Sequence, residues 1–397
     1  MAASLPKSKQ PSLVGKLEGH TDTINQAVPI PGEDAIISVA DDKTMRVWVK
    51  RDSGQYWPTI CQVYQAAASS LCYHHSSMKL FVGLSNGTIH EYKLSRDLNR
   101  LDPKRTYLAH AGRVTGLHCV DEQDWLLSVS RDKSFQWYCT KTGRKLGSFE
   151  AHAWCLAVQY DPKNNYGFVS DYSGQINVLK LDTTGISFVT TLKGHQSSVR
   201  CLCYDSEKRI LYSGGFDQII VVWDIGSQQG TAFELTGHKS KIRALYFSHT
   251  HKLLSASEDK VVGLWDLDSE RQETAEWGAG SACEKCGVPF FWNVKEMWAQ
   301  KTVGVRQHHC RRCGRAVCAT CSHHESTFPP MGFEIPVRMC EDCHADVSTD
   351  DRNPLASFVT LPFSILYMAM DEGRGLMVTT DTDKVIRVYD ARQMLAD

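Results

Sequence analysis

Four Cys-x-x-Cys pairs lie between positions 283 and 343 of the sequence. Two thiolates separated by two residues can bind one zinc ion from a single tight turn, and eight thiolates complete two tetrahedral Cys₄ sites. The four pairs are Cys283/Cys286, Cys310/Cys313, Cys318/Cys321 and Cys340/Cys343. We therefore predict a small domain that depends on two zinc ions for its fold.

The second pair lies inside a basic string, RQHHCRRCG, which runs from Arg306 to Gly314. Guanidinium and imidazole N–H groups donate hydrogen bonds to phosphate oxygens, and a local excess of positive charge attracts anions even when the whole chain has a net charge of -1. His308 and His309 have a spacing that zinc ligands could also have. Because eight cysteines already saturate two sites, we expect both histidines to face an anionic ligand instead.

Other features of the sequence limit the cellular setting. The N-terminal segment has no apolar core of the kind found in secretory signals, and no window approaches 18 uninterrupted apolar residues. We therefore expect neither a signal peptide nor a transmembrane helix, and we expect the thiols to stay free or to bind metal in a reducing compartment. The cysteines outside the pairs are predicted to be small core residues: Cys61, Cys72, Cys119, Cys139, Cys155, Cys201 and Cys203.

The remainder of the chain is repetitive. Three units open with Gly-His and close with Trp, and the His-to-Trp separations are 28, 28 and 27 residues: His20 to Trp48, His195 to Trp223 and His238 to Trp265. This pattern is typical of the four-stranded WD40 blade, and weaker copies occupy the intervals. Seven units of about 40 residues predict a mainly β fold, a seven-bladed WD40 β-propeller that closes into a ring.

Ser or Thr, His and Asp recur together in these units. In five of them a hydroxyl residue precedes the turn aspartate by four positions: Ser38/Asp42, Ser128/Asp132, Ser213/Asp217, Ser255/Asp259 and Thr379/Asp383. In WD40 blades this aspartate accepts from the Gly-His imidazole, which bonds the hydroxyl and then the Trp, because buried polar groups without partners cost about 1–3 kcal/mol each. The residue types match a hydrolytic triad, but we predict a structural role and no catalytic residue.

The zinc module interrupts the propeller. The third strand of blade 6 ends near Trp265, and the next strand-like segment, Leu355 to Leu361, follows the last cysteine pair. The predicted division is residues 12–268 for blades 1–6, 272–348 for the inserted finger and 353–392 for the rest of blade 6 and blade 7. The N-terminal strand 12–19 is expected to close the ring.

The strings RQHHCRRCG, VCATC and RMCEDC resemble the FYVE finger, and together with the propeller the chain resembles the small WD-repeat and FYVE-domain-containing proteins. The segments KRDSGQYWP and VPFFWN strengthen this resemblance. It implies crossed zinc ligation. One ion would be held by Cys283, Cys286, Cys318 and Cys321, and the other by Cys310, Cys313, Cys340 and Cys343.

The resemblance also implies that the finger binds phosphatidylinositol 3-phosphate. The residues carried over as lipid-binding are Arg306, His308, His309, Arg311 and Arg338. A membrane-inserting loop would comprise Val303, Gly304 and Val305, with internal packing as the alternative for the two valines. The aromatic run from Pro289 to Trp298 is expected to form domain core.

The predicted function is that of a non-enzymatic endosomal adaptor with two Zn²⁺ ions, cytoplasmic and peripheral on early endosomes. Its propeller would bind signalling or trafficking proteins, kinases among them by resemblance, and homodimerisation stays open. The sequence departs from the FYVE pattern at two positions: Gln307 replaces a basic residue and Gly280 replaces an acid. One alternative is therefore a finger that does not bind lipid and acts as a protein-interaction module. A RING-like ubiquitin ligase is another. Nucleic-acid binding through the arginines is disfavoured because no C₂H₂ or nuclear-receptor helix pattern is present.

Overall fold

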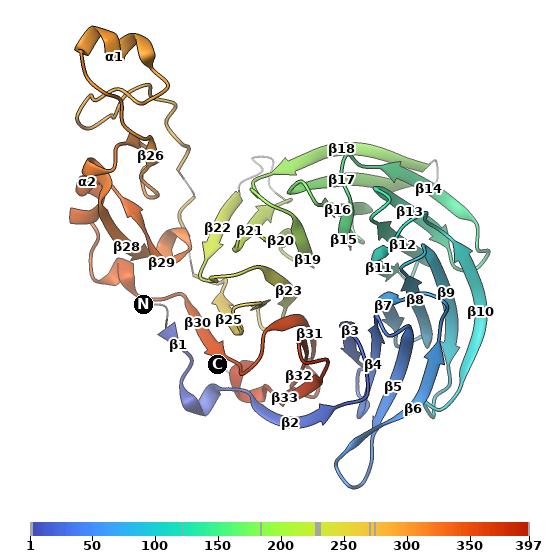
Figure 1. Cartoon of the computed structure of the whole chain (residues 1–397). Helices are drawn as coiled ribbons and strands as arrows, with labels where there is room; N and C mark the ends of the chain where they lie inside the picture. Colours follow the sequence, from blue (N-terminus) through green and yellow to red (C-terminus); the bar gives the residue numbers. More distant parts are fainter. Residues whose placement is uncertain are drawn as a thin grey trace.

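A computed structural model describes residues 3–120, 122–182, 185–226, 232–269, 271–273 and 275–395. Seven four-stranded antiparallel blades surround a central channel, which confirms the predicted propeller (Figure 1). Blades 1 and 2 consist of β3 (Ile24–Pro29), β4 (Ala35–Ala40), β5 (Thr44–Lys50), β6 (Tyr56–Val63), β7 (Ala68–His74), β8 (Lys79–Leu84), β9 (Thr88–Leu94) and β10 (Leu101–Leu108). Blades 3 and 4 consist of β11 (Val114–Val120), β12 (Trp125–Ser130), β13 (Ser134–Cys139), β14 (Lys145–Glu150), β15 (Cys155–Asp161), β16 (Tyr166–Asp171), β17 (Gln175–Asp182) and β18 (Gly185–Lys193).

Blade 5 is built from consecutive strands, whereas blades 6 and 7 each take one strand from a distant part of the chain. Blade 5 consists of β19 (Val199–Asp205), β20 (Ile210–Gly215), β21 (Ile219–Asp224) and β22 (Ala232–Thr236). Blade 6 consists of β23 (Ile242–Phe247), β24 (Lys252–Ser257), β25 (Val261–Asp266) and β30 (Ala356–Thr360), and blade 7 of β31 (Ile365–Asp371), β32 (Leu376–Asp381), β33 (Ile386–Asp390) and β2 (Ser12–Leu17). Because β2 pairs with β33, the N-terminal segment closes the ring, and α3 (Arg392–Leu395) follows the last strand.

The apolar core of the propeller lies between adjacent blades. One buried cluster joins blades 1 and 2 through side chains such as Val47 and Leu80, and another joins blades 3 and 4 through Trp137 and Val169. Each blade therefore buries both faces of its sheet against its neighbours. This packing is the reason that the strands read as apolar runs.

The repeated histidines pin the blades from within. In blade 1, His20 Nδ1 donates to Asp42 (2.8 Å), Ser38 donates to His20 Nε2 (2.7 Å), and Trp48 Nε1 donates to the Ser38 oxygen (2.8 Å). Blades 5 and 6 repeat the same chain of bonds. These side chains are saturated by one another, as expected for a structural role.

Blades 3 and 7 show two kinds of departure from this pattern. In blade 3 the His, Ser and Asp are bonded, but the Trp137 Nε1 group is buried without a hydrogen-bond partner among the described residues. In blade 7, where the Gly-His motif is missing, Arg387 forms a buried ion pair with Asp381. The expected chain from Thr379 through a histidine to Asp383 is therefore not formed in this blade, and Arg387 also approaches Asp383 (3.8 Å).

The cysteines of the propeller differ from expectation. Cys72 on β7 and Cys119 on β11 form a disulfide between blades 2 and 3, with a Cα–Cα distance of 6.4 Å, so the prediction that both are free is wrong. Cys61 is exposed on the outer strand of blade 1 and is not a core residue. Cys155 is buried as predicted, and the remaining three are half-buried.

The finger occupies the connection between β25 and β30 (Figure 1). Its elements are α1 (Val294–Gln300), β26 (His308–His309), β27 (Ala316–Val317), β28 (His324–Phe328), β29 (Phe333–Met339) and α2 (Glu341–Ala345), with 3-10 turns η2 (Thr320–Ser322), η3 (Pro329–Met331) and η4 (Asp350–Arg352).

The finger also contacts a second blade. β29 begins beside the end of β22, where Thr236 aligns with Phe333 and the Thr236 N–H donates to the Gly332 carbonyl (2.8 Å). The β28–β29 hairpin thereby extends blade 5 to six strands, and β1 (Ala3–Ser4), which leads through η1 (Lys7–Lys9) to β2, extends blade 6 to five. Both additions cover outer strand edges that would otherwise be open to pairing.

Candidate metal centres and anion pocket

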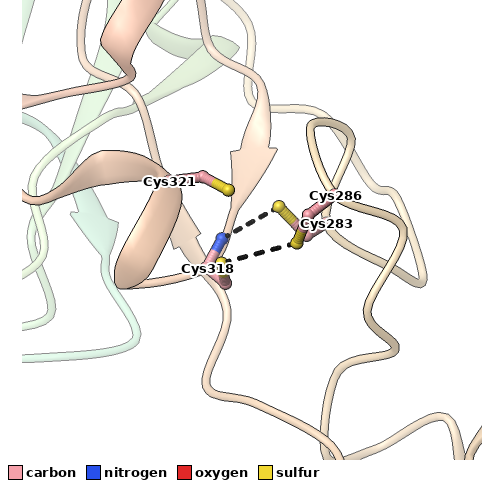
Figure 2. A group of neighbouring side chains, drawn as sticks. All are labelled: Cys283, Cys286, Cys318 and Cys321. Atoms are coloured by element: carbon pink, nitrogen blue, oxygen red, sulfur yellow. Dashed lines mark hydrogen bonds between the residues drawn. The ribbon is translucent and has the colours of Figure 1, made fainter.

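The first group of thiols joins two segments of the finger. Cys283 and Cys286 lie on one loop, and Cys318 and Cys321 approach from the facing segment around η2 (Figure 2). The sulfur atoms of this group all lie within 4.8 Å of one another, and the Cys286 and Cys318 sulfurs are 3.8 Å apart.

The second group joins the basic string to the end of β29. Cys310 and Cys313 come from the loop after β26, and Cys340 and Cys343 from the start of α2. Their sulfurs also lie within 4.8 Å, with 3.9 Å between Cys313 and Cys340.

These separations fit zinc. A tetrahedral Zn–S₄ centre with bonds of about 2.3 Å has sulfur–sulfur edges of about 3.8 Å. Each group supplies four thiols and no other donor, which is the ligand set of a closed structural site rather than of a catalytic one. The two groups therefore fit two structural zinc ions.

In each group, the pKa of one thiol is lowered below its ordinary value. Burial raises the pKa of Cys283, but backbone N–H groups, those of Cys286 and Cys318 foremost, outweigh it and bring the pKa to about 7. The pKa of Cys310 is lowered by the same balance, with N–H groups of Cys340 and Cys313 opposing burial. A low thiol pKa favours the thiolate that zinc requires.

The turn after the second cysteine pair depends on glycine. Gly314 adopts a φ of +74°, and its N–H donates to the Cys310 carbonyl (2.9 Å). A Cβ at this position would lie 1.9 Å from the Glu276 carbonyl oxygen. Any larger residue would therefore displace the segment that carries Trp277.

A pocket next to the second metal group brings the predicted lipid-binding residues together. Its lining comprises Trp277, Arg306, Gln307, His308, His309, Arg311 and Arg338. The histidines come from β26 and Arg338 from β29, and the Arg311 N–H donates to the Arg338 carbonyl (3.0 Å). The zinc-centred fold thus holds side chains 32 positions apart in sequence around one opening.

Several contacts hold these side chains in place. The ring of Trp277 stacks on His309 (4.7 Å between centroids), and the guanidinium of Arg311 lies over the same ring (4.6 Å). Arg338 donates to the Ser322 carbonyl (2.8 Å). Preorganised cationic groups lose less conformational entropy when a ligand binds. Trp277 was not predicted as a site residue, although it begins the segment Trp277 to Gly280 in which the FYVE pattern has an acid. That pattern did not indicate that its ring stacks on His309.

The charges of the pocket are unbalanced. Arg312 pairs with Asp346 (2.8 Å) and Arg315 with Asp342 (3.5 Å) on its outer side. Within the described part of the chain, the three arginines that line the pocket form no ion pair. Their positive charge is available to an anion.

The two histidines differ in their environments. His309 Nε2 contacts the Gly278 carbonyl (3.0 Å), an acceptor, so this nitrogen carries a proton. Burial, followed by the charges of Arg338 and Arg306, lowers the pKa of His308 below its usual range. His308 is therefore neutral at pH 7 and can donate only one hydrogen bond.

The two departures from the FYVE pattern have structural counterparts. Gln307 accepts a hydrogen bond from Trp292 Nε1 (3.1 Å), so it connects the pocket to the aromatic segment. At the other departure, a Cβ on Gly280 would lie 3.4 Å from the carboxylate of Glu284, which accepts from the Ala316 N–H (2.9 Å). The carboxylate of Glu284 thus lies close to position 280, where the FYVE pattern has an acid and this sequence has glycine.

The aromatic segment is only partly core. Phe290 is fully buried, as predicted, but Phe291 and Trp292 are 58% exposed and Trp298 on α1 is 80% exposed. The expectation that this run forms core is therefore wrong for these three residues. Of the three, only Trp298 lies on the seven-residue helix α1, whereas Phe291 and Trp292 lie in the segment that precedes it.

The neighbouring loop presents one apolar residue. Val303 is 79% exposed, whereas Gly304 is buried and a Cβ there would meet the Phe291 backbone at 2.9 Å. Val305 is half-buried and its N–H donates to the Pro289 carbonyl (3.0 Å). The apolar surface beside the pocket consequently consists of Val303 with Phe291, Trp292, Val294 and Trp298, and we call it the apolar tip.

Comparisons with known proteins agree with this architecture. The FYVE zinc finger profile matches residues 276–349, and the WD domain, G-beta repeat profile matches residues 11–49, 186–224 and 229–266. The chain is 43% identical to mouse "WD repeat and FYVE domain-containing protein 1" over 98% of its length and 95% of that protein, and 43% identical to human "WD repeat and FYVE domain-containing protein 2" over 98% of both. The solved WD40 β-propeller domain of Doa1 superposes with a TM-score of 0.64 at 18% identity over 96% of each chain, a likeness of fold alone.

Proposed function

The chain belongs to the family of WD repeat and FYVE domain-containing proteins, and from this premise we propose that it is a non-enzymatic adaptor on endosomal membranes. Its finger would bind phosphatidylinositol 3-phosphate, and its propeller would bind signalling or trafficking proteins. Two zinc ions would hold the finger in its binding conformation.

The observation that carries this proposal is a pocket lined by two histidines and by three arginines that form no ion pair with the residues described by the structure. A phosphomonoester carries between one and two negative charges near pH 7 and presents three acceptor oxygens. Planar guanidinium groups match such oxygens bidentately, and each charge-assisted bond contributes about 1.5–3 kcal/mol. An N–H of His308 would donate to the inositol ring, whereas the Nε2–H of His309 already contacts the Gly278 carbonyl.

The apolar tip supports a membrane as the source of this phosphate. Tryptophan and phenylalanine favour the interface between lipid and water, and each side chain of the tip contributes at most about 1.5–3 kcal/mol on insertion. Lys295 and Lys301 flank the tip and suit an anionic leaflet. Among the described helices, none combines the length and the apolar character needed to cross a bilayer. The proposed attachment is therefore peripheral and reversible.

The test is liposome binding by zinc-loaded full-length protein. We expect retention on liposomes with phosphatidylinositol 3-phosphate, weaker retention on those with the 4-phosphate, and a tenfold to hundredfold loss in Arg311→Ala, in line with about 1.5–3 kcal/mol for one charge-assisted bond. Arg315→Ala is the matched control, because Arg315 lies on the same finger but faces Asp342. Absence of binding with both zinc ions present would instead make the finger a protein-interaction module.

A further inference from the structure

The innermost strands of the propeller share one irregularity. In every blade the register of the innermost strand shifts around its second residue, as between Val199 and Cys201 in β19. A β-bulge re-aims the side chain of the extra residue, and all seven bulged residues line the cavity of the central channel. They are Asn25, Ser69, Thr115, Arg200 and Arg243, with leucines in blades 4 and 7. This ring opens on the face that carries the Gly-His segments, and we call it the channel mouth.

Positive charge concentrates at the channel mouth. Arg243 pairs with Glu258, and Arg113 pairs with Asp41 (2.7 Å). Arg200 forms no ion pair with any residue that the structure describes. The charged neighbours that lower its pKa are the arginines Arg243, Arg131 and Arg113, two of which are paired with the rim acids Glu258 and Asp41. Burial, followed by the charges of three neighbouring arginines with Arg243 foremost, lowers its pKa to about 10.

The fold itself does not require this charge. The equivalent positions in blades 2, 3 and 4 hold Ser69, Thr115 and Leu156, and those blades close the same ring. A cation that is desolvated and repelled by its neighbours destabilises the folded protein unless a ligand compensates it. Such unfavourable placement is typical of binding sites.

Exposed aromatic side chains flank the same mouth. Trp154 precedes β15 and is 44% exposed, and it packs against Tyr172 of the β16–β17 turn, which is 57% exposed (5.4 Å between centroids). The guanidinium of Arg131 lies over Trp154 (5.5 Å). Phe216, in the β20–β21 turn, lies between Lys241 (4.8 Å) and Arg243 (5.0 Å). Arginine beside tryptophan and tyrosine is the composition of protein-binding hot spots.

We propose that the channel mouth binds an acidic peptide segment of a protein partner. One carboxylate of the segment would reach Arg200, and an apolar neighbour would pack on Trp154 and Tyr172. Asp41 and Glu258 at the rim disfavour a continuous polyanion such as a nucleic acid, so the complement is a short acidic stretch. This inference rests on the proposed scaffold role of the propeller, and it is independent of lipid binding by the finger.

The experiment selects peptides from a random phage-displayed library on zinc-loaded full-length protein and then measures fluorescence anisotropy with the enriched peptides. We expect enrichment of Asp and Glu beside an apolar residue, and an affinity that falls about tenfold or more in Arg200→Gln. Arg144→Gln is the matched control, because Arg144 is exposed in the turn between β13 and β14 at the opposite face. Enrichment without acidic residues, or equal affinity in Arg200→Gln and wild type, would overturn the proposal.

Two further readouts separate this proposal from other roles of the same residue. If Arg200 serves binding, Arg200→Gln keeps or raises the thermal midpoint because it removes repulsion, whereas a lowered midpoint with unchanged peptide affinity would indicate a structural role and overturn the proposal. Retention of Arg200→Gln on liposomes with phosphatidylinositol 3-phosphate should equal that of wild type. Failure of lipid binding by all variants, with peptide binding intact, would overturn the finger's proposed function alone.

Discussion

The propeller and the finger use the same polar residue types in opposite ways. In blade 1, His20 is buried and both of its ring nitrogens are bonded, to Asp42 and Ser38. In the finger, His308 and the pocket arginines are half-buried or exposed and lack carboxylate partners among the described residues. The difference teaches that hydrogen-bond saturation, and not residue type, separates a structural group from a binding group.

The two regions also differ in what holds them together. The propeller buries apolar side chains between every pair of neighbouring blades, whereas the finger has one small core that includes Cys283, Cys310, Cys318 and Cys340. A domain whose core consists partly of metal ligands draws its folding free energy from the metal. The comparison therefore predicts that the two regions respond separately to zinc.

Loss of zinc should have the largest effect. Chelation, or Cys310→Ser, removes a contribution of about 10 kcal/mol or more to folding of the finger, while the blades keep their packing. Hydrogen–deuterium exchange should show loss of protection in β26 to β29 and unchanged protection in blades 1 to 4. Cys155→Ser, in the propeller core, is the control. Equal loss of protection in both regions would contradict the separation.

The junction between the regions should respond to pH. Glu334 on β29 is 1% exposed, and burial raises its pKa to about 7 against the opposing N–H of Leu355 and charge of Arg271. Because the folded pKa lies above the ordinary value of 4.5, stability is lost as pH rises from about 4.5 through 7, by at most about 3 kcal/mol. Glu334→Gln should therefore stabilise the protein at pH 8 and have little effect at pH 5.

Urea unfolding of the zinc-loaded protein at both pH values measures this difference. Glu325→Gln is the matched control, because Glu325 lies on the adjacent strand β28 and is exposed. The same stability change in Glu334→Gln at pH 5 and pH 8 would show that the carboxyl does not titrate at the junction.

Much of this architecture was predictable from the sequence, and the reasons are physical. A constant His-to-Trp spacing predicts a blade because the hydrogen bonds that join His20, Ser38 and Trp48 form only when these residues stand at fixed separations along the strands. Cysteine pairs predict zinc because two thiolates separated by two residues can bind one ion from a single tight turn. Exposure of Trp298 and the bond between Cys72 and Cys119 were not predictable, since both depend on which segments become neighbours.

A comparison of two blades tests how much one hydrogen bond within a blade contributes to stability. Trp48 Nε1 donates to Ser38, whereas the equivalent Trp137 Nε1 is buried and has no hydrogen-bond partner in the part of the chain that the structure describes. Both rings are almost fully buried, so Trp→Phe removes similar apolar area at each site. We expect Trp48→Phe to be more destabilising than Trp137→Phe by about 1–2 kcal/mol in thermal or urea unfolding, because only the first loses a hydrogen bond. Equal values would mean that the bond contributes nothing net.

The smallest expected effect concerns the departure at Gly280. The Glu284 carboxylate is held by the Ala316 N–H and would lie 3.4 Å from a Cβ at position 280. Restoring an acid by Gly280→Asp would bring two carboxylates together, so their repulsion should offset any new bond to inositol.

We expect Gly280→Asp alone to leave lipid affinity unchanged or lower it a few-fold, and Gly280→Asp with Glu284→Gln to raise it. Liposome binding by wild type, both single variants and the double variant forms a cycle that isolates this coupling. Additive effects would show that Glu284 does not substitute for the missing acid, and the pocket would then rely on its cations alone.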